Sequence, residues 1–272
     1  EASWGMAVLR GKRDPYGGIL VDSSSLPPAP SDFGRVLAAS LSQWHTEGIR
    51  GVWLSLPLPS NASLLEVAVK HGFKAHHATP RHITLSAWLP ENQPNTLPGP
   101  ACHYAGVGVA VVDAEDRILV VQELNGPLKG RGYWKVPTGM VEANEGLSEA
   151  ARREVREETG VECEIQGMVC LRETHSLHVQ RLTDLFFLFK ARPLTTDLTP
   201  QDSEILQAKW MPLQEYLSLP QWRPGSAPSH LNTLMVNHLE DPQKGGLFLP
   251  VALPRGGNRG DAVVYGRGRA KL

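Results

Sequence analysis

The stretch Gly139–Val161, GMVEANEGLSEAARREVREETGV, decides how the rest of this chain is interpreted. Most residues from Leu147 to Glu158 are good helix formers. Gly160 follows them, at the place where a helix C-terminal cap favours a left-handed residue. The stretch therefore predicts a loop followed by a capped helix.

Three carboxylates share one face of this predicted helix. Glu154, Glu157 and Glu158 stand at i, i+3 and i+4, where like charges destabilise an isolated helix. A divalent cation among them offsets that repulsion, and hard oxygen ligands suit magnesium or manganese. The opposite stripe is apolar and is expected to pack on a sheet. It consists of Leu147, Ala151 and Val155.

The spacing of the fixed residues matches the Nudix box, and the chain resembles a Nudix hydrolase. The match runs from Gly139 through Glu145 and Arg153-Glu154 to Glu157-Glu158 and Gly160. The resemblance implies an α/β fold, namely a Nudix α/β/α sandwich with a mixed sheet. It also implies a metal site, with Mg²⁺ or Mn²⁺ bound by Gly139 (through its carbonyl), Glu154, Glu157 and Glu158.

The resemblance assigns further roles around the box. Glu145 and Gly160 are expected to be structural, and Arg153 to fix the loop and the helix. Family members often use another glutamate from a late loop, and Glu204 falls at that place. The expected catalytic residues are Glu154, Glu157, Glu204 and Arg153. Either Glu154 or Glu204 is the general base.

The sequence outside the box divides into three parts. Residues 1–95 predict a small α/β domain for packing or dimerisation, residues 101–222 the Nudix domain, and residues 223–272 an extension. A proline-rich linker, residues 90–100, separates the first two parts. In the first domain Asp32 is the expected N-cap of a helix. In the second, residues 106–112 and 118–122 predict a hairpin of buried strands.

The resemblance extends over about residues 32–216. Over these residues the chain is similar to the plant cytosolic Nudix hydrolases that act on ADP-ribose and NADH. It is also similar to their animal relative, the antisense fibroblast growth factor Nudix protein. This implies hydrolysis of the pyrophosphate bond of a nucleoside diphosphate linked to another moiety, with release of AMP, by a homodimer. The subgroup usually has Gly-Lys-Ser-Asp where this chain has Arg181-Leu-Thr-Asp184, which leaves the exact nucleotide open.

Four cations are candidates for holding a small-molecule nucleotide substrate. Two lie on a strand beyond the box and two in the glycine-rich loop before it: Arg172, His175, Lys129 and Arg131. Two alternatives remain. One is a non-catalytic Nudix-fold subunit that binds or assembles a larger complex. The other is RNA decapping or hydrolysis of another dinucleotide.

Composition limits the remaining partners. The formal net charge of −1 implies no general affinity for nucleic acid, apart from a weak role of the basic tail Arg255–Leu272. No apolar run is long enough to span a membrane. The three scattered cysteines favour a reducing, intracellular compartment, cytoplasm first. Because the sequence starts at Glu1, a removed targeting peptide and an organelle address stay open.

Overall fold

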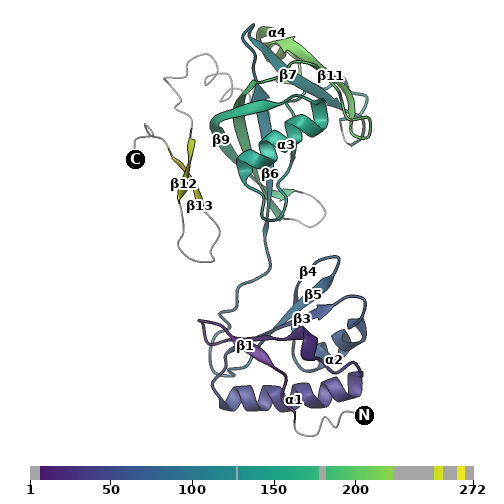
Figure 1. Cartoon of the computed structure of the whole chain (residues 1–272), viewed down its shortest axis with the longest axis vertical. Coiled ribbons are helices and arrows are strands. Elements are labelled where there is room, and N and C mark those ends of the chain that lie inside the picture. The colour runs from purple at the N-terminus through teal and green to yellow at the C-terminus, as the bar shows by residue number, and fades with distance from the viewer. Residues whose placement is uncertain (1–6, 127, 178–181, 223–247, 254–261, 267–272) are drawn as a thin grey trace. The chain divides into compact units, whose positions relative to one another are not determined.

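The computed structural model describes residues 7–126, 128–177, 182–222, 248–253 and 262–266. The chain divides into two compact units, Glu1–Cys102 and His103–Leu272, each with its own buried core (Figure 1).

The first unit is built on a five-stranded sheet in the order β1-β2-β3-β5-β4. Strand β2 runs parallel to β3, and the other neighbouring pairs are antiparallel. The strands are β1 (Gly11–Arg13), β2 (Ile19–Val21), β3 (Gly51–Pro57), β4 (Lys74–Ala78) and β5 (His82–Trp88). The helices are α1 (Pro30–Thr46), α2 (Leu65–Lys70) and the 3-10 turns η1 (Ser23–Ser25) and η2 (Ala62–Leu64).

The core of this unit lies on one face of the sheet. Val52 and Leu54 of β3 are fully buried together with Phe33 and Leu37 of α1. Because side chains alternate along a strand, Trp53 points to the opposite face. That face is therefore left for other contacts.

Helix α1 begins earlier than the sequence suggested, so the prediction of Asp32 as its N-cap is wrong. Ala29 is the N-cap and makes no side-chain capping bond, and Pro30 is the first helical residue. Proline is favoured there because its φ is already helical and its missing N–H has no partner to lose. Asp32 lies in the first turn and pairs with Arg35 at 2.5 Å.

The second unit contains a mixed four-stranded sheet, β8-β6-β10-β9, and a two-stranded sheet, β11-β7. Its strands are β6 (His103–Val111), β7 (Arg117–Glu123), β8 (Thr138–Met140), β9 (Cys163–Leu177), β10 (Leu182–Pro193) and β11 (Ile205–Pro212). Its helices are α3 (Leu147–Thr159) and α4 (Leu213–Leu217). Strand β10 runs parallel to β6 and antiparallel to β9.

Two core clusters lie on opposite sides of the β6–β10 pair. Val107 of β6 packs with Val155 of α3, whereas Ala110 of β6 packs with Met211 of β11 and Tyr216 of α4. Helix α3 therefore covers one side of the sheet (Figure 1), and α4 packs on the other side together with β11. This confirms the predicted α/β/α sandwich with a mixed sheet.

The predicted hairpin of residues 106–112 and 118–122 is wrong in its pairing. A tight turn joins β6 and β7, with the Asp113 N–H donating to the Arg117 carbonyl at 3.0 Å. Beyond one bridge, Val112 to Ile118, the strands separate: β6 pairs with β8 and β10, and β7 pairs with β11. Both strands are buried on both faces. Their continuous apolar runs are therefore equally compatible with pairing to each other in one sheet and with lying in two different sheets.

Little of the C-terminal extension lies within the described residues. Phe248 pairs with Met168 of β9, and β12 (Leu249–Leu253) pairs with β13 (Ala262–Gly266). The basic tail Arg255–Leu272 falls outside the described residues apart from β13. No helix in the described part of the chain is long and apolar enough to cross a membrane.

Candidate active site

Helix α3 is fixed at both ends by local contacts. At its N-terminus the Glu149 carboxylate accepts from the Gly146 N–H at 3.1 Å. At its C-terminus Gly160 adopts φ 76°, and its N–H donates to the Arg156 carbonyl at 2.8 Å. A residue with a side chain is strained at that φ, which is why glycine ends the helix. The predicted apolar stripe faces the core, with Ala151 and Val155 fully buried.

The Arg153 guanidinium is the centre of a carboxylate network. Nε and Nη2 donate to the two Glu145 oxygens at 2.7 and 2.9 Å. Nη1 donates to Glu154 at 2.7 Å and to Glu157 at 3.0 Å, and Nη2 also reaches the Met140 carbonyl at 2.9 Å. These bonds use all five N–H groups of the side chain. The Arg153 charge also lowers the pKa of the Glu145 carboxyl, chiefly through hydrogen bonding.

Glu154 lies directly against Gly139. A β-carbon built on Gly139 would overlap the Glu154 carboxylate, so only glycine leaves this space. Burial raises the pKa of Glu154, and hydrogen bonding and charge from Arg153 partly oppose the rise. The Glu204 charge raises it further, so the two carboxyl groups interact electrostatically.

Glu158 is the most buried carboxylate of the helix, with 4% of its surface exposed. Its Oε2 accepts from the Thr138 N–H at 3.2 Å, and its Oε1 lies 3.9 Å from Lys135 Nζ. Burial raises the pKa of Glu158 to about 7, although the Lys135 charge opposes the shift. Glu157, by contrast, leaves 46% of its side chain exposed and contacts Arg153.

Lys135 and Glu123 belong to the same cluster, although the sequence did not single them out. Lys135 Nζ lies 2.7 Å from Glu123 Oε1 and donates to Thr138 Oγ1 at 2.6 Å. Only 16% of the Lys135 side chain is exposed. The sequence does hold one sign of Lys135, which stands inside the bulky run Tyr133-Trp-Lys-Val-Pro137. A lysine that is buried in such a run requires acidic or polar partners.

The loop before β11 brings Glu204 to this cluster. Its backbone is tied to the end of α3, because Thr199 N–H donates to the Thr159 carbonyl at 2.8 Å and Gln201 N–H to the Glu158 carbonyl at 3.3 Å. The Leu124 N–H then donates to the Glu204 carbonyl at 2.8 Å. An open cavity of about 530 Å³ lies here. Its lining includes Glu123, Lys135, Thr138, Glu158 and Glu204.

The donors around this cavity fit a hard divalent cation. Glu158 and Glu204 line it, and Glu154 interacts electrostatically with Glu204. Their carboxylate oxygens are the ligand type that magnesium and manganese prefer. The Glu154 carboxylate occupies the space that a β-carbon on Gly139 would fill. As they stand, no three acidic, histidine or cysteine side chains within the described ranges are grouped closely enough to hold an ion. Arg153 currently binds oxygens of Glu154 and Glu157, so loading a cation requires these side chains to turn.

The predicted substrate residues fall into two groups. Arg172 of β9 donates to Asp184 at 2.9 Å and lies 4.7 Å from the Phe186 ring centre, and its Nε is buried without a described partner. His175 is exposed beside Thr183.

Gly106 lies between the box residue Gly139 and Asp184, the partner of Arg172. A β-carbon there would lie 3.5 Å from the Gly139 carbonyl and 3.6 Å from Asp184 Oδ1. Lys129 and Arg131, in contrast, are exposed in the loop before β8 and do not line the cavity.

Comparison with known proteins shows the family of this chain. A Nudix hydrolase domain model matches residues 9–89, and a NUDIX domain model matches residues 103–231. Nudix hydrolase 7 of Arabidopsis thaliana is 41% identical over 215 residues, covering 78% of this chain and 75% of that protein. Nudix hydrolase 8 of the same plant is also 41% identical over 217 residues, covering 80% of this chain and 58% of that protein. Human nucleoside diphosphate-linked moiety X motif 6 is 34% identical over 217 residues, covering 78% of this chain and 67% of that protein.

The chain belongs to the Nudix hydrolase family, whose members hydrolyse pyrophosphate bonds in small nucleotides with divalent metal ions. The resemblance to plant Nudix hydrolases and to an animal relative is confirmed. The chain spans only 58% of the length of Nudix hydrolase 8.

Proposed function

We propose that this chain hydrolyses the pyrophosphate bond of a nucleoside diphosphate linked to another moiety, with Mg²⁺ or Mn²⁺ and with release of AMP. One observation carries the proposal. The box carboxylate Glu158 and the late-loop carboxylate Glu204 line one cavity, and Glu154 interacts electrostatically with both. A fold that had lost hydrolysis would gain nothing from holding repelling carboxylates together at the expense of stability.

The chain's own residues have distinct tasks in this reaction. Glu154, Glu158 and Glu204 would hold the divalent cation, which when bound would neutralise phosphate oxygens and activate water for attack on phosphorus. Glu154 or Glu204 takes the proton of the attacking water. The bridging P–O bond then breaks and the second phosphate leaves with the other moiety. Arg153 acts by positioning, because its five N–H groups all hold protein oxygens.

ADP-ribose and NADH are the first substrates we propose. Both carry a pyrophosphate with two sugars, and both need a polar group beside the metal carboxylates. Arg172 supports this choice because 32% of its side chain is exposed and its guanidinium lies over Phe186. A ribose hydroxyl or phosphate oxygen would accept from the exposed part of the guanidinium, which the neighbouring Asp184 keeps oriented.

We also propose that the protein acts as a homodimer through its first unit, residues 1–95. This unit has its own buried core, so it can offer a surface to a second copy independently of the Nudix domain. Sedimentation of the full chain and of a variant lacking residues 1–95 tests this. The full chain should be a dimer and the shortened chain a monomer, whereas a dimeric shortened chain would contradict the proposal.

The activity itself is tested by product analysis. ADP-ribose, NADH, a diadenosine polyphosphate and capped RNA are incubated with magnesium or manganese, and the released nucleotides, AMP or the cap nucleotide, are measured by chromatography. Glu154→Gln should reduce turnover by on the order of 10²-fold or more. Glu162→Gln, an exposed carboxylate just beyond the helix, is the matched control and should not change it. No turnover of any compound by folded protein would favour the non-catalytic subunit.

A further inference from the structure

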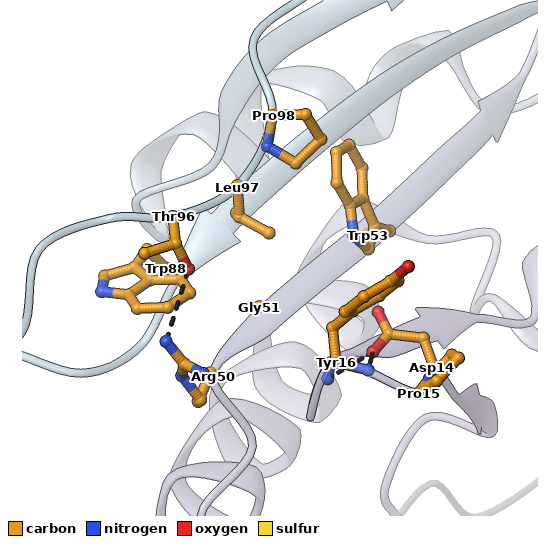
Figure 2. A pocket seen from close by; sticks show the side chains of 11 residues that line it. Asp14, Pro15, Tyr16, Arg50, Gly51, Trp53, Trp88, Thr96, Leu97 and Pro98 are labelled. Carbon is orange, nitrogen blue, oxygen red and sulfur yellow. Dashed lines mark hydrogen bonds between the residues drawn. The ribbon is translucent and has the colours of Figure 1, made fainter.

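A second cavity, of about 900 Å³, lies in the first unit on the sheet face that carries Trp53. Figure 2 shows its walls: β3 and β5, the turn after β1, and the segment 96–98 that leads out of the unit. Every residue that lines it belongs to residues 1–102. The cavity therefore shares no residue with the carboxylate site, and a ligand bound in it needs none of the groups proposed for hydrolysis.

The cavity presents an arginine without a counter-ion. The Arg50 guanidinium lies 4.9 Å from the Trp88 ring centre, and Nη2 donates weakly to Thr96 Oγ1 at 3.3 Å. Its Nε is buried and has no hydrogen-bond partner among the described residues. No described carboxylate forms an ion pair with it. Because Arg50 as a whole is only partly buried and lines the cavity, an anion there can accept a charge-assisted bond from the accessible part of the guanidinium.

Aromatic rings surround the same space. Tyr16 is 85% exposed, and Trp53 and Trp88 are half-buried. In Figure 2 Tyr16 and Trp53 stand on one side of Gly51, and Trp88 and Arg50 on the other. Indole and phenol rings with an accessible face bind planar heteroaromatic rings by stacking.

The turn that carries Tyr16 is already fixed. Asp14 Oδ1 accepts from the Tyr16 N–H and the Gly18 N–H, each at 2.8 Å. The opposite wall is fixed too, since Leu97 packs on Gly51, where a β-carbon would lie 2.5 Å from Leu97 Cδ2. The cavity is thus preformed, which reduces the ordering required on binding.

We propose that this cavity binds a planar heteroaromatic ring that carries an anionic group, as in a nucleoside monophosphate. The anion pairs with Arg50, and the ring stacks among Tyr16, Trp53 and Trp88. The volume lies within the range of about 300–1,000 Å³ usual for small-molecule sites. A purely apolar ligand would leave Arg50 unpaired, and a cation would be repelled by it.

Calorimetry on the full chain with EDTA tests the proposal, using AMP, adenosine and inorganic phosphate as probes. AMP has both ring and anion, and should bind at least about tenfold more tightly than either part alone. Hydrogen exchange locates the site: AMP should protect amides in residues 14–18, 50–53 and 95–98. AMP that leaves exchange in all three segments unchanged overturns the proposal.

Variants separate the two halves of the site. Arg50→Gln should weaken AMP at least about tenfold, whereas Arg81→Gln, an exposed arginine of the same unit outside the cavity, should not. Tyr16→Ala removes an exposed ring that the fold does not need, and should weaken AMP about five- to tenfold or more. Equal affinity of the two arginine variants, or full binding by Tyr16→Ala, contradicts the proposal.

Discussion

The Arg153 guanidinium holds the Glu145 carboxylate through two parallel hydrogen bonds, Nε to Oε1 at 2.7 Å and Nη2 to Oε2 at 2.9 Å. This pair joins the helix to the loop before it across eight residues of sequence. Because the same guanidinium also holds Glu154 and Glu157, the loop and two candidate metal ligands depend on one side chain.

Arg153→Lys keeps the charge but loses the planar fork, so we expect it to fail functionally. An ammonium group cannot hold Glu145 in two parallel bonds and still reach Glu154 and Met140. Hydrolysis should fall by about 10–100-fold and stability by about 1–3 kcal/mol, measured by kcat/KM and urea unfolding. Arg152→Lys, the exposed neighbour, is the control and should behave as wild type.

Gly139→Ala should remove activity with little loss of stability. The added β-carbon overlaps only the end of the Glu154 side chain, which is flexible and can move away. The displaced carboxylate then no longer serves the cation, and we expect a loss on the order of 10²-fold in kcat. Thermal melting should change by only a few degrees. Gly99→Ala, at a position with open space, is the comparison, and equal activity of the two variants would refute this role.

Glu158 predicts a pH dependence of stability in metal-free buffer. Burial raises its pKa to about 7 in the folded state, above the unfolded value of about 4.5. Between about pH 4.5 and 7 the folded state keeps a proton on Glu158 that the unfolded state has released. The contribution of Glu158 to stability is therefore greatest below about pH 4.5 and is lost as pH rises to about 7.

Relative to Glu158→Gln, the wild type should therefore lose a few kcal/mol of stability, on the order of 3, between pH 4.5 and 8. Urea unfolding with EDTA at several pH values measures this difference. A difference that does not vary with pH would mean that the carboxyl is solvated in solution.

Arg172→Gln should raise KM for the nucleotide more than it lowers kcat. The residue is a proposed substrate contact, and its loss removes binding that is equal in the ground and transition states. We expect about a tenfold increase, with Arg192→Gln, an exposed arginine on β10 paired with Glu164, as the control. Steady-state kinetics decides; an unchanged KM would assign Arg172 to packing against Phe186 alone.

The box made much of this unit predictable from sequence. The helix, its glycine cap and the apolar stripe follow from local spacing, and the structure has helix Leu147–Thr159 where they indicated it. The contact of Arg153 with a carboxylate also follows, because i and i+4 residues are neighbours on a helix.

Other features depend on contacts distant in sequence. Glu158 follows Ala151 by seven residues and Val155 by three, so helical spacing places it beside the buried stripe and Glu157 away from it. The Glu158 partners Thr138 and Lys135, which complete the burial, come from another part of the chain. The pairing of β6 and β7 was mistaken because an apolar strand does not reveal its neighbour. The Arg50 cavity was missed because its aromatic residues come from separate elements, and each alone resembles an ordinary surface residue.

The tie between the late loop and the end of α3 has a dynamic consequence. Thr199 and Gln201 hydrogen-bond to Thr159 and Glu158 through the backbone, so Glu204 moves with the helix and not as a free loop. Thermal displacement is then shared by both sides of the cavity. We therefore expect the separation between the carboxylates to fluctuate less than the position of either one, although they come from two distant segments of the chain.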